Sequence, residues 1–248
     1  MLSLSACAPI EPNKVKLGDE LLKQTGILGY WNFDEIALGT ASGGKDFADQ
    51  SGAGHQGHAI GGLRLGDAGP SKNAVTSNGF GAISIPIDLS HEKVVTLSIW
   101  VNPSTSFPNP QNILFEYTAD SRTGDGFMAS LSDSSASPVN ALLMWLHSPS
   151  GFFARTTPTL NPGWHNVVTT FDRSNPSQNS ITLYLDGNLV STTPRGALYS
   201  NEGAPFANST LYLLCRGGTS SCLEAQIDEL IMWNRVVTPA DIQSPFAI

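Results

Sequence analysis

The sequence predicts an all-β fold in which two antiparallel sheets pack face to face as a sandwich, with one short helix near the C-terminus. Gly (24) and Pro (16) are abundant and only 14% of the 248 residues are charged, as is typical of short strands joined by tight turns. About a dozen apolar or alternating segments recur at roughly ten-residue spacing. No helical pattern separates these segments, so we expect a two-sheet sandwich.

The sequence predicts the first strands with different clarity. Gly29–Phe33 is rich in aromatic residues and predicts a strand, whereas residues 37–57 predict a Gly- and Ser-rich loop. Ala82–Pro86 alternates and is expected to end at its Pro, because Pro cannot donate to a sheet ladder. Val94–Val101 is the clearest strand, since its alternate residues are large and apolar.

The remaining strands follow without an internal linker. We expect them at 112–117, 126–131, 141–147, 152–157, 164–171, 180–185, 188–192, 210–215 and 224–233. Asp186-Gly187 predicts a two-residue hairpin turn, because Gly accepts the positive φ that a type I′ turn requires. Thr238-Pro239-Ala240-Asp241 combines a helix N-cap, a Pro at the first helical position and an acid in the first turn, so it predicts the terminal helix.

Residues 1–26 lack strand periodicity, and we expect them to be a truncated lipoprotein-type signal and tether. Leu4-Ser5-Ala6-Cys7 resembles the bacterial lipobox, in which the chain is cut before a Cys that then receives lipid. The alternative is a chance tetrapeptide before a free thiol. The lipobox interpretation predicts lipidation at Cys7 and a place in the bacterial cell envelope, as an outer-membrane lipoprotein or an extracellular protein.

Cys215 and Cys222 flank a turn-like loop between two apolar segments. A disulfide between them would staple a hairpin, and it requires an oxidising compartment. In the loop-entropy model, so short a ring stabilises the fold by roughly 2–3 kcal/mol. Two free thiols are the alternative, and export favours the disulfide.

The charge pattern argues against two classes of partner. The formal net charge is −8 and no run of Lys or Arg occurs, so phosphate neutralisation on nucleic acid is not expected. No run of about 18 apolar residues occurs, so the only membrane attachment expected is a lipid at Cys7. An acidic surface rich in Ser, Thr and Asn suits neutral sugars or calcium, and it is also the ordinary surface of a secreted protein.

Six motifs follow one another along the chain. They are Tyr30-Trp31-Asn32-Phe33-Asp34-Glu35; Asp49-Gln50-Ser51-Gly52 with His55-Gln56-Gly57; Leu97-Ser98-Ile99-Trp100-Val101; Gly163-Trp164-His165-Asn166-Val167-Val168; Leu183-Tyr184-Leu185-Asp186-Gly187; and Gln226-Ile227-Asp228-Glu229-Leu230 with Trp233-Asn234-Arg235. In this order they resemble the laminin G-like jelly roll of the concanavalin A-like lectin/glucanase superfamily. The resemblance implies that residues 27–248 form one jelly-roll domain. It also implies a choice among sugar binding, adhesion and roles accessory to enzymes, so the fold alone does not define the activity.

The resemblance also implies that the first and last strands are neighbours, which would bring Asp34 close to Asp228. Asp49, or carbonyl groups of the Gly-rich loop, would then complete a set of oxygen ligands of the kind that Ca²⁺ prefers. Family relatives often carry a structural calcium ion in this region, so we predict Asp34, Asp49 and Asp228 as its ligands. The alternative is that Glu35 and Glu229 are hydrogen-bonded structural acids and that the Asp residues cap turns.

A catalytic role is the minority interpretation. Glu224, Gln226 and Asp228 alternate on one predicted strand, and glycosidases with a related sandwich place their two carboxyl groups in this way. The middle position here is an amide, so we assign no catalytic residue.

Tyr117, Trp145 and Phe152 are candidate sugar platforms, because the C–H faces of pyranoses pack on flat rings; the alternative is that they are core residues. The expected function is that of an exported, non-catalytic module that binds glycans or a cell-surface protein. The alternatives are a structural or adhesive subunit of a cell-surface assembly and a glycoside-active enzyme.

Overall fold

The computed structural model of the chain describes residues 22–39, 46–104, 111–118, 124–132, 140–148, 151–175, 180–190, 193–195, 203–238 and 241. Most of these residues lie in strands. The strands are β1 (Ile27–Trp31), β2 (His58–Ala68), β3 (Asn73–Asp88), β4 (Val94–Pro103), β5 (Gln111–Tyr117), β6 (Phe127–Ser132), β7 (Ala141–Ser148), β8 (Gly151–Thr159), β9 (His165–Asp172), β10 (Ser180–Leu185), β11 (Asn188–Leu189), β12 (Thr193–Arg195), β13 (Asn208–Leu213) and β14 (Glu224–Trp233). Within this described part of the chain, no helix is long and apolar enough to cross a membrane.

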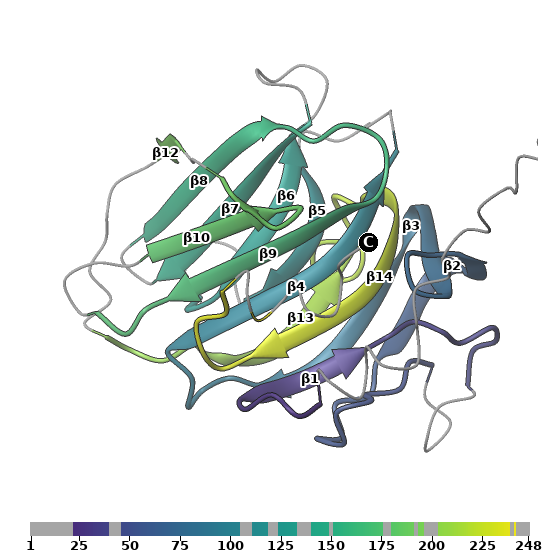
Figure 1. Ribbon diagram of the computed structural model, residues 1–248, viewed down its shortest axis with the longest axis horizontal. Helices are drawn as coiled ribbons and strands as arrows, with labels where there is room; N and C mark the ends of the chain where they lie inside the picture. The colour runs from purple at the N-terminus through teal and green to yellow at the C-terminus, as the bar shows by residue number, and fades with distance from the viewer. Residues whose placement is uncertain are drawn as a thin grey trace, which may run out of the picture.

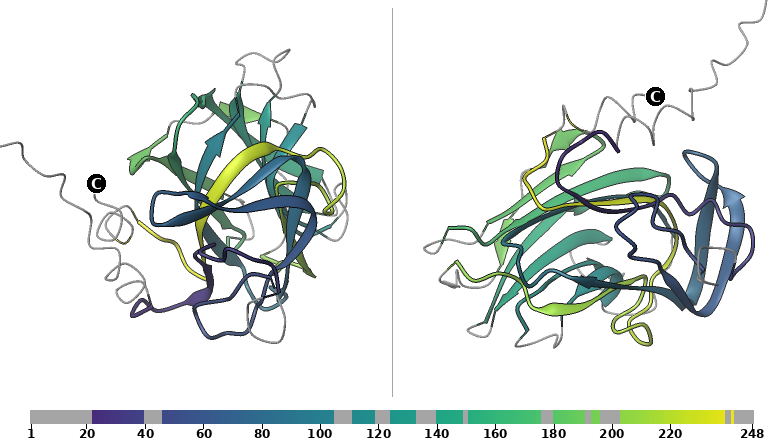
Figure 2. Two further views of the ribbon diagram at one scale, coloured as in Figure 1. Left: turned by 90° about the vertical axis from the view of Figure 1, so that its right-hand side faces the viewer. Right: turned by 90° about the horizontal axis from the view of Figure 1, so that it is seen from below.

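Antiparallel pairing joins the strands into one curled sheet that folds over into two layers (Figures 1 and 2). The hydrogen-bonded order is β11-β10-β9-β4-β14-β3-β13-β5-β6-β7-β8-β12, with β1 added to β14 and β2 added to β3. β3 belongs to both layers, because its first half pairs with β14 and its second half pairs with β13. The predicted all-β jelly-roll sandwich is therefore confirmed.

The first and last strands meet, as predicted. β1 pairs antiparallel with the second half of β14, so that Ile27 faces Trp233 and Trp31 faces Leu230. β3 pairs with the first half of the same edge of β14, and β4 covers its other edge. β14 is thus the strand on which β1, β3 and β4 converge.

The core fills the space between the two layers. Leu97, Ile99 and Val101 are fully buried, as the alternation of β4 predicts. From the opposite layer, Phe127 stacks on Phe171 with ring centroids 4.6 Å apart and planes 15° apart. The two layers therefore adhere through a continuous apolar interior, and a second, smaller apolar cluster forms around Ile231 and Trp233 of β14.

The described chain ends are bound to each other beside the end of β14. The Trp233 indole N–H and the Arg235 guanidinium both donate to the Gln24 side-chain oxygen, each at 3.2 Å. Arg235 also donates to the Thr25 carbonyl at 2.9 Å. At the start of the predicted terminal helix, the Asp241 carboxylate accepts the Thr238 N–H at 2.8 Å, as a capping box requires. The body of that helix lies outside the described residues.

The structure corrects two strand predictions. Residues 58–68 form β2, which the sequence did not predict because Gly61, Gly62 and Gly66 lower its β propensity. β3 does not end at Pro86 but continues to Asp88. The strand tolerates Pro86 because β2 no longer pairs with β3 at that point, so one side of the strand needs no backbone donor.

Two local predictions hold. Asp186 and Gly187 both have positive φ (51° and 76°) and join β10 to β11, as a type I′ turn requires. Cys215 and Cys222 form the predicted disulfide just after β13. The buried Glu116 carboxylate accepts hydrogen bonds from the Arg216 guanidinium at 3.3 Å and from the Gly217 N–H at 3.1 Å. These bonds anchor the loop that the disulfide closes.

Candidate functional site

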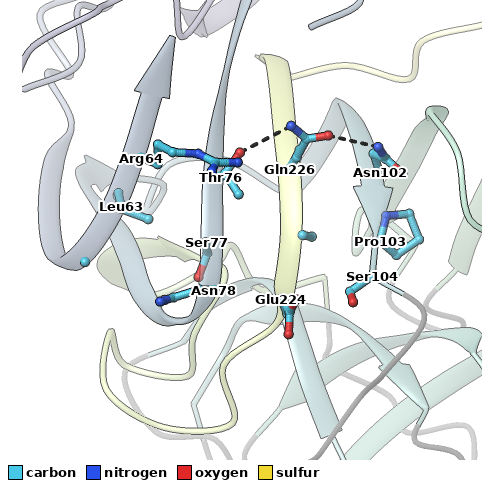
Figure 3. Close-up of a pocket in the computed structure, with 12 residues that line it drawn as sticks. Leu63, Arg64, Thr76, Ser77, Asn78, Asn102, Pro103, Ser104, Glu224 and Gln226 are labelled. Atoms are coloured by element: carbon cyan, nitrogen blue, oxygen red, sulfur yellow. Dashed lines mark hydrogen bonds between the residues drawn. The ribbon is translucent and has the colours of Figure 1, made fainter. Parts of the chain in front are cut away.

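A groove of about 580 Å³ lies where β2, β3, β4 and β14 run side by side, at the beginning of β14 (Figure 3). The residues that line it come in equal numbers from the four strands and their ends. They are Gly62, Leu63, Arg64, Thr76, Ser77, Asn78, Asn102, Pro103, Ser104, Glu224, Ala225 and Gln226. Their polar side chains form two rows across the strands.

The first row consists of cross-strand partners at one level of the sheet. Arg64 faces Thr76, Thr76 faces Gln226, and Gln226 faces Asn102. The Asn102 amide donates to the Gln226 carbonyl oxygen at 2.9 Å, and the Gln226 amide donates to the Thr76 hydroxyl at 3.3 Å (Figure 3). At about 4.8 Å between neighbouring strands, this row is roughly 14 Å long.

Both ends of this hydrogen-bond chain are fixed. At one end the side-chain oxygen Oδ1 of Asn102 accepts a hydrogen bond from the Gly163 N–H at 3.0 Å. At the other end Thr76 donates to the Asp67 carboxylate, which Arg64 also binds at 2.7 Å. The Thr76 hydrogen bond, and then Arg64, lower the pKa of Asp67, so this acceptor stays ionised. The orientation of each amide is therefore determined by its partners, and the chain is polarised towards Asp67.

The second row lies two residues further along the strands. Asn78 faces Glu224 across β3 and β14, and the Ser104 N–H donates to the Glu224 carbonyl at 3.0 Å. The side chains of Asn78 and Glu224 are exposed, and neither is hydrogen-bonded to another described residue. Two-residue spacing puts the two rows roughly 7 Å apart on one face of the sheet.

The groove can hydrogen-bond a ligand that carries hydroxyl groups. Each amide of the first row uses one N–H within the row and keeps a second, while Glu224 supplies an acceptor and Arg64 supplies further donors. Of the described residues that line the groove, one is an acid, Glu224. Asp228, two positions after Gln226, is fully buried and is not among the residues that line the groove. Glu224 and Asp228 thus do not form the facing carboxyl pair that glycoside hydrolysis uses.

Asp228 instead belongs to a buried acid cluster at a bulge in β14. The register with β4 shifts between Asp228 and Ile231, and Glu229 has a φ of 51°. The Ser71 N–H donates to the Asp228 carboxyl at 3.3 Å, and the Tyr30 hydroxyl donates to the Glu229 carboxyl at 2.7 Å. Asp228 and Glu229 are therefore structural groups that connect β14 to β1 and to the β2–β3 turn.

Burial dominates the electrostatics of this acid cluster. Burial, and then the adjacent Glu229, raise the pKa of Asp228 to about 8. Burial raises the pKa of Glu229 to about 7, although the Tyr30 hydrogen bond lowers it. Burial and Glu229 likewise raise the pKa of Tyr30. Asp34 makes a smaller contribution that also raises the pKa of both acids.

The three predicted calcium ligands do not converge on one point. The Asp49 carboxylate accepts the backbone N–H groups of Tyr30 (3.1 Å), Ser51 (2.9 Å) and His55 (3.0 Å), as well as the Ser51 hydroxyl (2.6 Å). Asp34 accepts the Asn73 N–H at 3.1 Å. These donors occupy the oxygens that a cation would need, as the turn-capping alternative predicts.

The other acids, His and Cys residues in the described ranges do not supply a metal site either. Among the described residues, no group of three or more His, Cys, Asp or Glu side chains is arranged to hold a metal ion. Asp34, Asp49 and Asp228 thus do not fit a shared calcium site in this arrangement. Calcium binding stays a prediction that rests on the family resemblance alone.

The predicted sugar platforms lie away from the groove. Tyr117 is fully buried, and its hydroxyl binds the backbone carbonyls of Ile87 and Ala207 at 3.1 and 2.7 Å, so its ring offers no surface to a ligand. Trp145 is half-buried on β7, in the other layer, and stacks on His147 with centroids 6.4 Å apart. The side chain of Phe152 and all of Cys7 lie outside the described residues.

Sequence reasoning did not find the groove, although a signal for it exists. Thr76 and Asn78, Asn102 and Ser104, and Glu224 and Gln226 are pairs of polar residues two positions apart near the ends of strands. Such pairs place polar side chains on one face. The sequence contains many similar pairs of polar residues, however. Only the pairing of β2, β3, β14 and β4 in the folded chain brings these three pairs together.

Comparisons with known proteins agree with the fold. The sequence profile described as the concanavalin A-like lectin/glucanases superfamily matches residues 77–243. A comparison with curated protein sequences gives no match. Among solved structures, domain 4 of AbnA, a GH43 extracellular arabinanase from Geobacillus stearothermophilus, in complex with arabinotriose, is similar with a TM-score of 0.63 and 17% identity. The similarity covers 89% of this chain and 98% of that chain.

Two botulinum neurotoxin structures are also similar to this chain. The binding domain of botulinum neurotoxin DC in complex with SialylT matches with a TM-score of 0.64 and 13% identity over 92% of this chain. The same binding domain in complex with rat synaptotagmin II matches with a TM-score of 0.63 and 12% identity over 93% of this chain. In both cases the match covers 52% of the toxin chain. At these identities the likeness establishes the fold.

Proposed function

Because the chain belongs to the concanavalin A-like lectin/glucanases superfamily, we propose that it is a non-catalytic module that binds a glycan in the groove between β2, β3, β4 and β14. The observation that carries the proposal is the oriented row of Thr76, Gln226 and Asn102 along this groove. A sugar offers many hydroxyl groups, each both donor and acceptor, and such a row offers both partners in fixed positions. Preorganised partners lose little conformational entropy on binding.

The similar structures support the glycan as the ligand class. One of them is a domain of an arabinanase bound to arabinotriose, and it aligns over nearly its full length. Another is a toxin binding domain bound to SialylT. These ligands belong to those proteins, and the transfer to this chain rests on the groove that the two polar rows form.

The groove also supports a non-catalytic role. A glycosidase needs two carboxyl groups on opposite sides of the scissile bond, within roughly 5–9.5 Å of each other. Glu224 faces solvent at the groove, whereas Asp228 and Glu229 are buried in hydrogen bonds of the acid cluster. If the wild type hydrolysed a bound glycan and Glu224→Gln abolished that hydrolysis, the result would support the glycoside-active alternative.

A second candidate function is attachment to a protein in a cell-surface assembly. β2 pairs only with β3 among the described strands, so much of its other edge is open to a further strand, although the Ala59 N–H donates to the Asp46 carboxylate at 2.8 Å. An extended segment of a partner can add to such an edge. The similar toxin domain in complex with rat synaptotagmin II is an example of a protein partner for this fold. Recovery of the chain in a protein complex, without glycan binding, would favour this function.

We further propose export and a lipid anchor at Cys7. The Cys215–Cys222 disulfide supports an oxidising compartment. The described chain ends lie beside the end of β14, at Gln24 and Arg235, whereas the groove lies at its beginning, nine residues earlier. At about 3.3 Å per residue this separation is roughly 30 Å. A tether at the N-terminal side would therefore leave the groove accessible.

The test is titration calorimetry with neutral trisaccharides such as arabinotriose, xylotriose and cellotriose, and with sialyllactose as an acidic probe. We expect at least one neutral probe to bind, and Gln226→Ala to weaken its binding by about tenfold or more, because it removes two hydrogen-bonding groups. Gln50→Ala, an exposed Gln in the loop after β1, is the matched control and should bind like the wild type. Equal affinity of Gln226→Ala and the wild type would exclude the groove as the binding site.

A further inference from the structure

β3 carries a three-residue bulge, Asn78-Gly79-Phe80, next to the groove. Gly61 faces Gly81 on one side of the bulge and Leu63 faces Ser77 on the other, so these three residues oppose the single residue Gly62. β2 and β3, the two strands that the bulge separates, lie at one end of the molecule (Figures 1 and 2). Since Gly62 and Asn78 both line the groove, the bulge forms part of its wall.

The bulge is held in one conformation by a single hydroxyl group. The Ser77 side chain accepts the Gly79 N–H at 3.2 Å and the Gly81 N–H at 3.3 Å. The same hydroxyl donates to the Gly81 carbonyl at 3.0 Å. Ser77 is fully buried, so these three bonds do not compete with solvent.

Glycines allow β2 and the bulge to approach closely. A Cβ atom at Gly61 would lie 2.3 Å from the Phe80 carbonyl oxygen, and one at Gly81 would lie 2.5 Å from the Gly62 carbonyl oxygen. Gly79 has a φ of 86°, which few other residues adopt. These features project the Phe80 side chain outward from a rigid backbone.

Phe80 is an unusual surface residue. Its side chain is 79% exposed, the most among the large hydrophobic side chains of the described residues. A single exposed apolar residue needs no explanation by itself. Here, however, Phe80 belongs to the same bulge as Asn78, which lines the groove, and the described lining contains no aromatic residue of its own.

The charges at the groove restrict the ligand further. Arg64 and Asp67 are paired with each other at 2.7 Å, which leaves Glu224 as an unbalanced negative charge. A carboxylated or sialylated sugar is also negative, so Glu224 would repel it. A neutral glycan avoids the repulsion and still offers hydroxyl groups to both polar rows.

We propose that Phe80 is the stacking platform for one end of a neutral linear oligosaccharide, about three sugars long, that lies along the groove. This inference rests on the proposed function and names its ligand class and a specificity residue. The apolar face of a terminal sugar covers the ring, and the hydroxyl groups of the remaining sugars bind the row from Arg64 to Asn102. An aromatic surface combined with a few oriented polar groups is the usual composition of a small-ligand site.

The experiment uses the full chain and the neutral trisaccharide that the wild type binds most tightly. We expect Phe80→Ala to weaken binding by about tenfold, because one buried ring face is worth roughly that change in affinity. Phe80→Trp should restore binding, and its added indole emission should shift to the blue when the trisaccharide is present. Leu189→Ala is the matched control, since Leu189 is 67% exposed on β11, at the other edge of the sheet.

The outcomes separate this inference from the proposed function. Loss of affinity in Phe80→Ala, with unchanged affinity in Leu189→Ala and an unchanged melting temperature in both, supports stacking on Phe80. Wild-type affinity in Phe80→Ala together with weakened binding in Gln226→Ala would overturn the stacking and keep the groove. Tighter binding of sialyllactose than of any neutral trisaccharide would overturn the ligand class, and no binding of any sugar would overturn both proposals.

Discussion

Replacing Asp228 with Asn should change how the stability of the protein depends on pH. In the folded chain, burial and Glu229 raise the pKa of Asp228 from 3.8 to about 8. The unfolded chain releases this proton as the pH rises above its ordinary pKa, whereas the folded chain retains it up to about pH 8. The unfolded state therefore binds fewer protons across this window, so the free energy of unfolding falls as the pH rises.

The magnitude follows from the shifted pKa values. While one such group is protonated only in the folded state, each pH unit removes about 1.4 kcal/mol of stability. Between pH 5 and pH 7, Asp228 alone accounts for a loss of up to about 3 kcal/mol. Glu229, with a pKa of about 7, contributes in the same direction. Tyr30, Asp34 and Ser71 face this pair; Asp34 adds to the repulsion and is itself paired with Lys72 at 3.6 Å.

The assay is urea unfolding of the wild type and of Asp228→Asn at pH 5, 6 and 7. At pH 5 the variant should be less stable by about 1 kcal/mol, because the two Asp228 oxygens accept the N–H groups of Ser71 and Glu229, whereas an Asn amide offers one acceptor oxygen. At pH 7 it should equal or exceed the wild type, since it has no proton to lose. Asp88→Asn is the control: the Ser90 backbone N–H lowers the pKa of Asp88, so this group is ionised in both states throughout the range.

Two results would refute this reasoning. A wild type that is as stable at pH 7 as at pH 5 would show that Asp228 and Glu229 do not retain protons in the folded state. A pH slope that is equal in Asp228→Asn and in the wild type would show that the dependence arises from other groups.

Three further predictions concern the disulfide, the bulge and the groove. Replacing Cys215 and Cys222 with Ser should lower the free energy of unfolding by roughly 2–3 kcal/mol, and identical urea curves for this variant and the wild type would contradict it. Gly81→Ala should lower the free energy of unfolding by about 1–3 kcal/mol, because its Cβ would lie 2.5 Å from the Gly62 carbonyl oxygen and from Leu63. Gly62→Ala, which meets nothing within 4 Å, should melt like the wild type, and equal losses in both variants would show that close packing is not the cause. Thr76→Val removes the hydroxyl that joins Gln226 to Asp67, so calorimetry should show about tenfold weaker binding of a neutral trisaccharide, and unchanged affinity would argue against preorganisation of the row.

Several features were predictable because the information for them is local. The alternation in Val94–Val101 predicts a strand, and β4 contains that segment, with both of its faces buried. Asp186-Gly187 needs only its own backbone preferences to form the hairpin turn. The disulfide joins cysteines seven positions apart. The order of weak motifs from Tyr30 to Trp233 was sufficient to predict the fold and the pairing of β1 with β14.

The functional features depended on pairing between distant segments. Thr76 and Gln226 are 150 positions apart, and Gln226 and Asn102 are 124 positions apart. Each of these three residues looks like an ordinary polar strand residue in its own segment. β2 was missed for the same reason, since its glycines make it a strand only when β3 lies beside it.

The acids show the same division between sequence and structure. Asp34 and Asp49 lie in the loops after β1, and Asp228 lies in the middle of β14. Sequence alone could not distinguish shared metal ligands from separate hydrogen-bond acceptors. The tertiary structure gave Asp49 four donors and buried Asp228 beside Glu229. A residue's face along a strand is determined by its neighbours in the chain, so sequence predicts it. A residue's partner across a sheet is determined by the register of strands that are far apart in the chain, and no single segment carries that information.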